Sequence, residues 1–286
     1  MNASSSGLQR RRVAAPPTTE ESRRPSEEEK EEEQPRFTIM EEVLLLGLKD
    51  KQGYLSFWND NISYCLRGCI LIELAFRGRI AMVPDPNRRR QPLAERFIEV
   101  INDESTGEVL LDEALKLMKA SEYMSVMNWI DLMSGETWSV MKAGYQLKQV
   151  RERLAKGLVD KGVLRTEKRN FLLFDMATHP VNDFRVKEEI VNRVCSTLIS
   201  PVEPDLRTAA MVCAAYAANV LENALVTLSY ERREQALTRV DELLGDYSVW
   251  PMQGKAANRF LDKGGELCME VVSAVLDVFT KVDSIL

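Results

Sequence analysis

Histidine is nearly absent from this sequence of 286 residues, in which His179 is the only one. A single histidine excludes the metal sites that need two, including the helical zinc motif of metalloproteases, and we expect no metal or cofactor. A glycine-rich phosphate loop, a serine nucleophile elbow and a Cys-x-x-Cys pair are missing as well. A nucleophilic pair of a cysteine with His179 stays open, although no orienting residue lies nearby in the sequence. We therefore expect a protein that is not an enzyme.

Long apolar runs and an excess of basic residues are also missing. The longest stretch without a charged residue, 208–221, has 14 residues, whereas a membrane-spanning helix needs about 20 apolar ones. We expect no transmembrane segment and, from the polar residues 1–9, no signal peptide. With 38 basic and 44 acidic residues, the net charge of −6 argues against a nucleic-acid partner. The five cysteines are an odd number and lie in apolar segments, which predicts buried, reduced thiols of a cytosolic protein.

The sequence divides into a charged tail, residues 1–36, and a single globular domain, residues 37–286. The tail has few apolar residues, contains several prolines and is almost wholly acidic over residues 27–33. Such a segment cannot bury enough surface to offset the entropy of ordering, so we expect it to be disordered. Near its start, Arg10, Arg11 and Arg12 form a basic cluster. This cluster is either a solvated group without a role or a short motif for an acidic partner or an anionic membrane.

The globular domain is expected to be mainly α, a helical bundle with one protruding β-hairpin. Thr38 and Glu41 form a capping box before a first helix, and a strongly apolar second helix runs to about Phe76. Further helices are expected at about 110–120, 126–133, 138–160, 183–199, 205–228, 230–244 and 266–284, with a strand at 79–83, an exposed arginine run at 88–90 and a loop at 246–264. A partly apolar run at 163–166 and an apolar run at 171–174 flank the polar residues 167–170, which predicts a β-hairpin of two strands joined by a polar turn.

Several basic residues are candidates for an anion-binding pocket. Lys148 and Arg151 are three residues apart and would share one face of the predicted helix 138–160. Arg67 lies in the apolar second helix, where an unpaired charge is costly, and Trp58 precedes it in an aromatic loop. Either Arg67 pairs with a carboxylate and Trp58 belongs to the core, or the basic groups hold a phosphate with Trp58 packed beside the ligand.

The predicted hairpin contains four consecutive apolar residues, Phe171, Leu172, Leu173 and Phe174. Because alternate residues of a strand point to opposite faces, such a run needs cover on both faces. Either the helices of the domain cover it, or its apolar tip enters the headgroup boundary of a membrane while Lys168 and Arg169 stay at the anionic surface. A basic pocket beside an apolar hairpin would suit a phosphorylated lipid.

Several stretches of the sequence resemble the Golgi phosphoprotein 3 family, and most closely its fungal vacuolar protein sorting members. They are Ser56-Phe57-Trp58-Asn59-Asp60, Leu66-Arg67-Gly68-Cys69 and Gln149-Val150-Arg151-Glu152-Arg153-Leu154-Ala155-Lys156, together with residues 40–50, 106–113, 128–132, 134–138 and 170–176. The resemblance covers about residues 37–286 and is densest from 38 to 180. Residues 8–12 also resemble the N-terminus of the fungal members.

The resemblance implies a peripheral protein on the cytosolic face of Golgi membranes that exchanges with the cytosol. It implies binding of phosphatidylinositol 4-phosphate, and retention of glycosyltransferases in the Golgi by linking their cytosolic tails to COPI coatomer. A homo-oligomer is a further expectation. Two other functions stay open. One is a structural, self-assembling scaffold whose hairpin and basic face serve oligomerisation, and the other is a phosphoinositide-metabolising enzyme, for which no nucleophile is visible.

The resemblance also implies roles for individual residues. The headgroup pocket would consist of Trp58, Arg67, Lys148 and Arg151, where Lys148 replaces an arginine of the animal members and lacks its planar fork. The cluster of Arg10, Arg11 and Arg12 would bind coatomer. The family's β-hairpin, associated with membrane insertion or oligomer contacts, corresponds to Glu167, Lys168, Arg169, Asn170, Phe171, Leu172, Leu173, Phe174, Asp175, Met176, Ala177 and Thr178.

Overall fold

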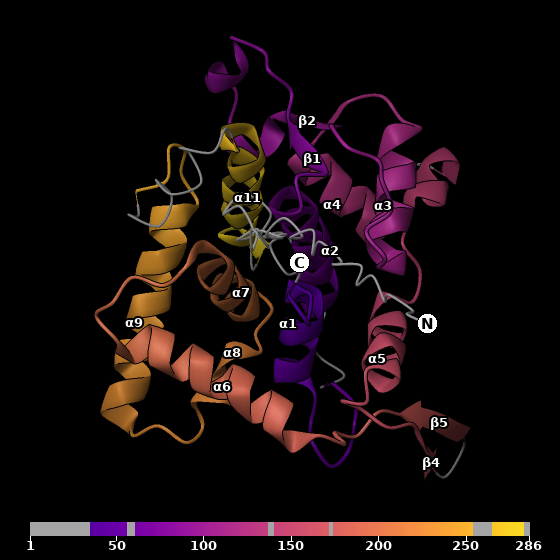
Figure 1. Cartoon of the computed structure of the whole chain (residues 1–286), viewed down its shortest axis with the longest axis vertical. Coiled ribbons are helices and arrows are strands. Elements are labelled where there is room, and N and C mark those ends of the chain that lie inside the picture. Colours follow the sequence, from indigo (N-terminus) through magenta and orange to yellow (C-terminus); the bar gives the residue numbers. More distant parts are fainter. Residues whose placement is uncertain (1–34, 56–60, 137–139, 172–173, 254–264, 283–286) are drawn as a thin grey trace, which may run out of the picture. The chain divides into compact units, whose positions relative to one another are not determined.

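The computed structural model describes residues 35–55, 61–136, 140–171, 174–253 and 265–282. The compact unit that begins at Phe37 is organised around two helices, α2 (Asn61–Phe76) and α7 (Leu206–Ala217), which pack against each other and both against α1 (Ile39–Gly47) and α11 (Glu266–Phe279) (Figure 1). The other α-helices of the described part are α3 (Val109–Lys119), α4 (Val126–Ser134), α5 (Val150–Asp160), α6 (Phe184–Ile199), α8 (Leu221–Leu225) and α9 (Tyr230–Tyr247). Three 3-10 helices complete them: η1 (Arg88–Arg90), η2 (Leu93–Glu95) and η3 (Val140–Tyr145). The prediction of a mainly α domain is confirmed.

The first helix begins where the capping box predicts. The Thr38 hydroxyl accepts a hydrogen bond from the backbone N–H of Glu41, and the Glu41 carboxylate accepts one from the backbone N–H of Thr38. Every residue of α1 is buried, because α2, α5, α6, α7 and α8 all pack against it. A helix that is apolar on nearly all sides is stable in water only in such a central position.

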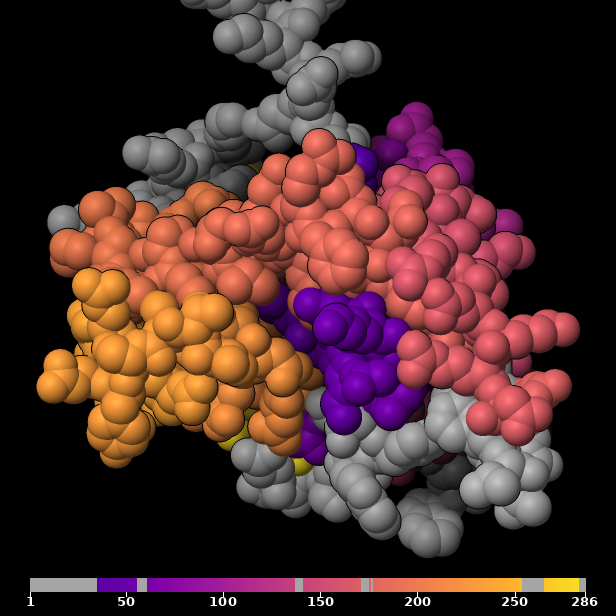
Figure 2. Space-filling view, turned by 90° about the horizontal axis from the view of Figure 1, so that it is seen from below, coloured from indigo at the N-terminus to yellow at the C-terminus, as the bar shows by residue number. Residues whose placement is uncertain are grey.

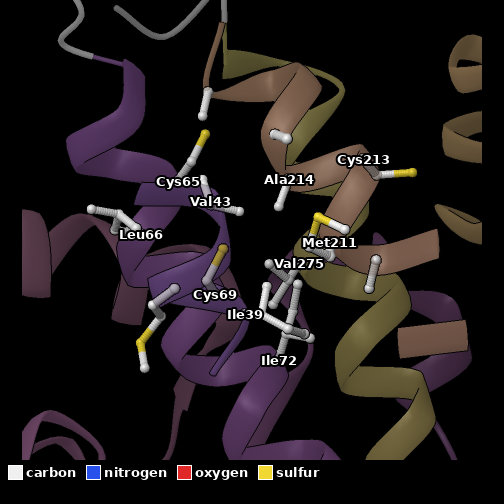
Figure 3. Packing of buried hydrophobic residues seen from close by; sticks show 14 of the residues in the cluster. Ile39, Val43, Cys65, Leu66, Cys69, Ile72, Met211, Cys213, Ala214 and Val275 are labelled. Carbon is white, nitrogen blue, oxygen red and sulfur yellow. The ribbon is translucent and has the colours of Figure 1, made fainter. Parts of the chain in front are cut away.

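Small and branched side chains of α1, α2, α7 and α11 meet in the core. Figure 3 shows Ile39 and Val43 of α1 close to Cys69 of α2, with Met211 of α7 and Val275 of α11 across the same space. The cysteines are free, as predicted; Cys65, Cys69 and Cys213 are buried, whereas Cys195 and Cys268 are half-buried. None of the described helices combines the length and apolar character that a membrane crossing needs.

A buried carboxylate on α2 ties three helices together. Glu73 is fully buried and accepts hydrogen bonds from Arg77, from Arg207 of α7 and from the backbone N–H of Ile39 at the start of α1. These three donors hold the pKa of Glu73 below its usual value, although burial alone would raise it. Since removing one partner of a buried ion pair costs about 3–5 kcal/mol, Glu73 holds α1 and α7 against α2.

A second buried carboxylate corrects one prediction. Glu270 of α11 is fully buried and accepts hydrogen bonds from Arg88 of η1 and from Arg96. The arginine run that we expected to be exposed is therefore only partly so: Arg89 and Arg90 are exposed, but Arg88 turns inward. A distant carboxylate, 182 residues later in the chain, decides this, and local sequence contains no sign of it.

The strands form two small antiparallel sheets. β1 (Ile80–Met82), β2 (Phe97–Val100) and β3 (Met124–Ser125) pair in the order β1-β2-β3, and β1 confirms the strand expected at 79–83. β4 (Glu167–Phe171) and β5 (Phe174–Thr178) form the hairpin, with Glu167 opposite Thr178 and Phe171 opposite Phe174. Figure 1 shows the hairpin protruding at the edge of the helical unit, beyond the end of α5.

The bounds of the hairpin agree with the family resemblance but not with the local pattern. The polar residues 167–170 belong to strand β4 rather than to a turn, and of the apolar run before them Leu164 forms only an isolated bridge with Val181. A protruding two-stranded ribbon is open to solvent, so its first strand can be polar. Residues 172–173, which connect the strands, lie outside the described residues.

Two predicted helices are interrupted. In place of the helix expected at 138–160, η3 ends at Tyr145 and α5 begins at Val150; between them Gln149 adopts a left-handed backbone with φ 53°. The helix expected at 205–228 is divided into α7 and α8 at Asn219, which has φ 54°. The apolar spacing continues through both breaks, so periodicity could not reveal them. Most of the loop expected at 246–264, residues 254–264, lies outside the described residues.

A close backbone approach connects the α1–α2 loop to the end of the hairpin. The backbone N–H of His179 donates to the carbonyl of Gly53 at 2.8 Å, and that of Val181 donates to the carbonyl of Asp50 at 3.0 Å. Gly53 has φ +67°, and a Cβ there would lie 2.2 Å from the backbone nitrogen of Pro180. Only glycine fits this approach.

This approach predicts that Gly53→Ala is far more destabilising than Gly78→Ala. Gly78 also has positive φ, +61°, but a Cβ there meets nothing within 4 Å. Both variants should lose about 1–2 kcal/mol to backbone strain, and Gly53→Ala about 1–3 kcal/mol more to overpacking. Urea unfolding followed by circular dichroism measures the difference. Equal losses in the two variants would show that the loop and the hairpin separate without cost.

Candidate anion-binding site

Arg67 is a buried cation whose partners are three backbone carbonyls and the Ser63 hydroxyl. Its side chain is 6% exposed. Nε donates to the carbonyl of Met133 at 3.3 Å, Nη1 to the carbonyl of Ser63 at 2.8 Å, and Nη2 to the carbonyl of Leu147 at 2.7 Å. The alternative that Arg67 pairs with a carboxylate finds no support among the described residues, where it forms no ion pair. Arg67 instead joins α2, the end of α4 and the segment before α5.

The charge of Arg67 is not neutralised by these contacts. Burial and, to a lesser extent, the positive charge of Arg151 together lower the pKa of Arg67 to about 10, while Glu152 acts in the opposite direction. Arg67 and Arg151 therefore lie within electrostatic reach of one another, as the predicted pocket requires. An anion placed between two such cations would be bound with charge-assisted hydrogen bonds.

Lys148 and Arg151 reach the site from two different backbone environments, so the prediction of one shared helical face is wrong. Lys148 precedes the left-handed residue Gln149 and is exposed, whereas Arg151 is the second residue of α5 and is half-buried. Neither side chain forms a hydrogen bond or ion pair with the part of the chain that the structure describes. Arg153, by contrast, pairs with Glu113 of α3.

The first turn of α5 adds backbone donors to these cations. Gln149 at the N-cap makes no side-chain hydrogen bond to the helix, so its side chain caps none of the first N–H groups of α5. A helix N-terminus carries partial positive charge and attracts anions. The candidate site therefore consists of the α5 N-terminus, Arg151, Lys148 and the buried Arg67, an arrangement suited to a phosphate rather than to an apolar ligand.

Other residues implied by the resemblance fall outside what the structure describes. Trp58, Arg10, Arg11, Arg12, Leu172 and Leu173 lie outside the described residues, and for Phe171, Phe174 and Met176 the description is limited to the backbone. Their roles stay predictions. In the described part of the hairpin, the Arg169 side chain turns back to donate to the carbonyl of Lys51, and Asn170 donates to Asp175 across the strands. Lys168 is exposed, whereas Arg169 is half-buried and engaged by Lys51.

Four of the five thiols are poor nucleophiles in this fold. Burial raises the pKa of Cys69, Cys195, Cys213 and Cys268, so these thiols stay protonated near neutral pH. Burial lowers the pKa of His179, and nearby Glu152 partly opposes this shift. The described His, Cys, Asp and Glu side chains form no cluster of three that could hold a metal ion.

A groove that the sequence did not indicate lies elsewhere, between the end of α1, α6 and α8. Its volume is about 560 Å³. Figure 2 views this region from below, with the indigo residues after α1 at its centre beside the salmon α6. Lys187 within it is already engaged by Asp50 and by the carbonyl of Leu48. The residues lining the groove include none of the predicted site residues, so the candidate anion-binding site is a separate feature.

The contacts of Arg67 predict that it is needed for stability, whereas Arg151 is not. Arg67→Ala should lower the free energy of unfolding by at least about 2 kcal/mol, because the Leu147 carbonyl loses its charged donor. Arg151→Ala, which removes a side chain without described partners, should change it by less than about 0.5 kcal/mol. Urea unfolding of both variants checks this. If both are near neutral, Arg67 does not organise the site.

The sequence of this chain is similar to that of known proteins. The family model described as Golgi phosphoprotein 3 (GPP34) matches residues 39–262. A protein of Schizosaccharomyces pombe called vacuolar protein sorting-associated protein 74 is 59% identical, over 88% of this chain and 83% of that protein. A protein of the same name from Eremothecium gossypii is 52% identical, over 88% of this chain and 85% of its own length. On this similarity, which spans most of the helical unit, the chain belongs to the Golgi phosphoprotein 3 family.

Proposed function

We propose that this chain is a peripheral Golgi adaptor that reads phosphatidylinositol 4-phosphate and takes part in protein sorting. The observation that carries the proposal is the pair of cations without described partners, Lys148 and Arg151, at the N-terminus of α5 beside the buried Arg67. A phosphorylated inositol ring offers a compact dianion that can bond several such donors at once. Family membership and the sorting names of the two fungal relatives support a place at the Golgi.

In this role Arg67 positions the site and the other two cations contact the ligand. Nη2 of Arg67 is engaged by the Leu147 carbonyl, one residue before Lys148. By holding this carbonyl, Arg67 fixes the backbone from which Lys148 and the first turn of α5 project. Its charge also adds to the positive electrostatic potential at the site. Trp58 would pack against the headgroup from the α1–α2 connection.

The remaining parts of the role concern partners. We propose that Arg10, Arg11 and Arg12 bind COPI coatomer and that the domain binds cytosolic tails of Golgi glycosyltransferases, so that these enzymes are retained. The hairpin of β4 and β5 would contact the membrane or a second copy in a homo-oligomer. Binding alone accounts for all of these steps, and no chemical reaction is required of the chain.

The proposal predicts that Arg151→Ala and Lys148→Ala each weaken binding of the soluble headgroup, inositol 1,4-bisphosphate, by about 10- to 100-fold. The reason is the loss of a charge-assisted hydrogen bond to phosphate, worth about 1.5–3 kcal/mol. Isothermal titration calorimetry measures the affinity, and vesicle co-sedimentation shows whether membranes follow it. Lys156→Ala is the matched control, because it removes an exposed cation from the same helix and should leave both unchanged.

Three results would decide between the functions considered. Wild-type affinity in both the Arg151 and the Lys148 variant would contradict the assignment of the site. Vesicle binding that ignores the phosphoinositide, together with assembly that rises with concentration, would favour the self-assembling scaffold. Turnover of the lipid would favour an enzyme.

A further inference from the structure

Met141 in η3 protrudes almost completely into solvent. Its side chain is 95% exposed, more than that of any other large apolar residue in the described part of the chain. Transfer of a long apolar side chain from water to an apolar environment is favourable. We propose that η3 is a membrane-contact element, which inserts Met141 into the headgroup–acyl boundary of an anionic bilayer next to the phosphate site. This inference rests on the proposed lipid-reading function and adds a second contact to it.

The protrusion of Met141 is held by contacts at the end of η3. The ring of Tyr145, the last residue of η3, packs edge-on against buried Trp129 of α4, with centroids 5.9 Å apart. Two residues later, the N–H of Leu147 donates to the carbonyl of Met133 at 3.1 Å, and its carbonyl accepts from Arg67. The same contacts that organise the phosphate site therefore also anchor η3 beside it.

The charge of the segment complements an anionic surface. Residues 140–151 contain Lys142, Lys148 and Arg151 but no acidic residue, in a chain whose net charge is −6. Lys142 is exposed, and within the described residues it forms no ion pair. An apolar side chain flanked by lysine and arginine is the arrangement by which peripheral proteins bind anionic membranes, because the cations stay at the phosphates while the apolar group enters.

A membrane fits this element better than a protein partner does. The residues after Met141 and Lys142 are Ala143 and Gly144, both exposed, and a Cβ on Gly144 would meet nothing within 4 Å. A specific protein interface needs a broad patch of complementary side chains. A bilayer needs no such shape, and one flexible methionine can enter it.

The test compares vesicle binding with headgroup binding in Met141 variants of the full chain. The vesicles contain phosphatidylcholine, phosphatidylserine and phosphatidylinositol 4-phosphate, and the soluble probe is inositol 1,4-bisphosphate. Met141→Ser should weaken vesicle binding by about 10-fold or more and leave the affinity for the soluble probe unchanged. Met141→Leu should restore vesicle binding. Val202→Ser, which changes a 70% exposed residue between α6 and α7, is the control and should leave both measurements unchanged.

Each other outcome contradicts the inference in a distinct way. If Met141→Ser binds vesicles like the wild type, η3 does not insert, and the proposed function stands. If Met141→Ser loses binding of both the vesicles and the soluble probe, Met141 belongs to the headgroup site or to its support. If it keeps vesicle binding but changes the sedimentation coefficient, Met141 contacts another copy. If the wild-type chain binds neither vesicles nor the probe, the proposed function fails and the inference fails with it.

Discussion

The candidate site depends on one buried guanidinium. Arg67 lies on α2 and donates hydrogen bonds to carbonyls at the end of α4 and just before α5, which are 66 and 80 residues later in the sequence. It therefore joins three segments of the chain. Because these acceptors are uncharged, they do not neutralise the positive charge of Arg67. Its pKa, lowered mainly by burial to about 10, keeps it protonated at neutral pH. Arg67 therefore both links these segments and contributes positive electrostatic potential to the site.

This arrangement divides the work among the basic residues. A cation that must hold three carbonyls cannot also move to meet a ligand, whereas Lys148 and Arg151 have no described partners and can. In the proposed role, the apolar hairpin and the η3 contact would add to a headgroup bond that alone would hold a monomer weakly. An oligomer would multiply these contacts through effective concentration. Attachment in which no single contact suffices would be reversible.

The sequence predicted what is set by local patterns. The capping box at Thr38, the buried α2 and most other helices follow from caps and apolar spacing, and the hairpin bounds follow from the family resemblance. It did not predict the breaks at Gln149 and Asn219, because left-handed backbone at a residue other than glycine leaves no mark in apolar periodicity. The inward turn of Arg88 was missed for a different reason, since its partner Glu270 is remote in the sequence.

The sequence proposed residues for the candidate site but not their geometry. Spacing alone placed Lys148 and Arg151 on one helical face, whereas Gln149 separates an exposed lysine from the first turn of α5. The carbonyl partners of Arg67 could not be foreseen, because every residue offers a carbonyl and only the fold selects which ones converge. The exposed Met141 was likewise hidden, since the expected long helix gave no reason for a protruding side chain there.

A crystal structure of the chain with inositol 1,4-bisphosphate would test the central claim most directly, namely that Arg67 organises the site while Arg151 and Lys148 bind the ligand. The account predicts a phosphate within hydrogen-bond distance of the Arg151 guanidinium and the Lys148 ammonium, at the first turn of α5, with the bond from Arg67 to the Leu147 carbonyl retained. A phosphate bound elsewhere, or one that draws Arg67 away from Leu147, would contradict it.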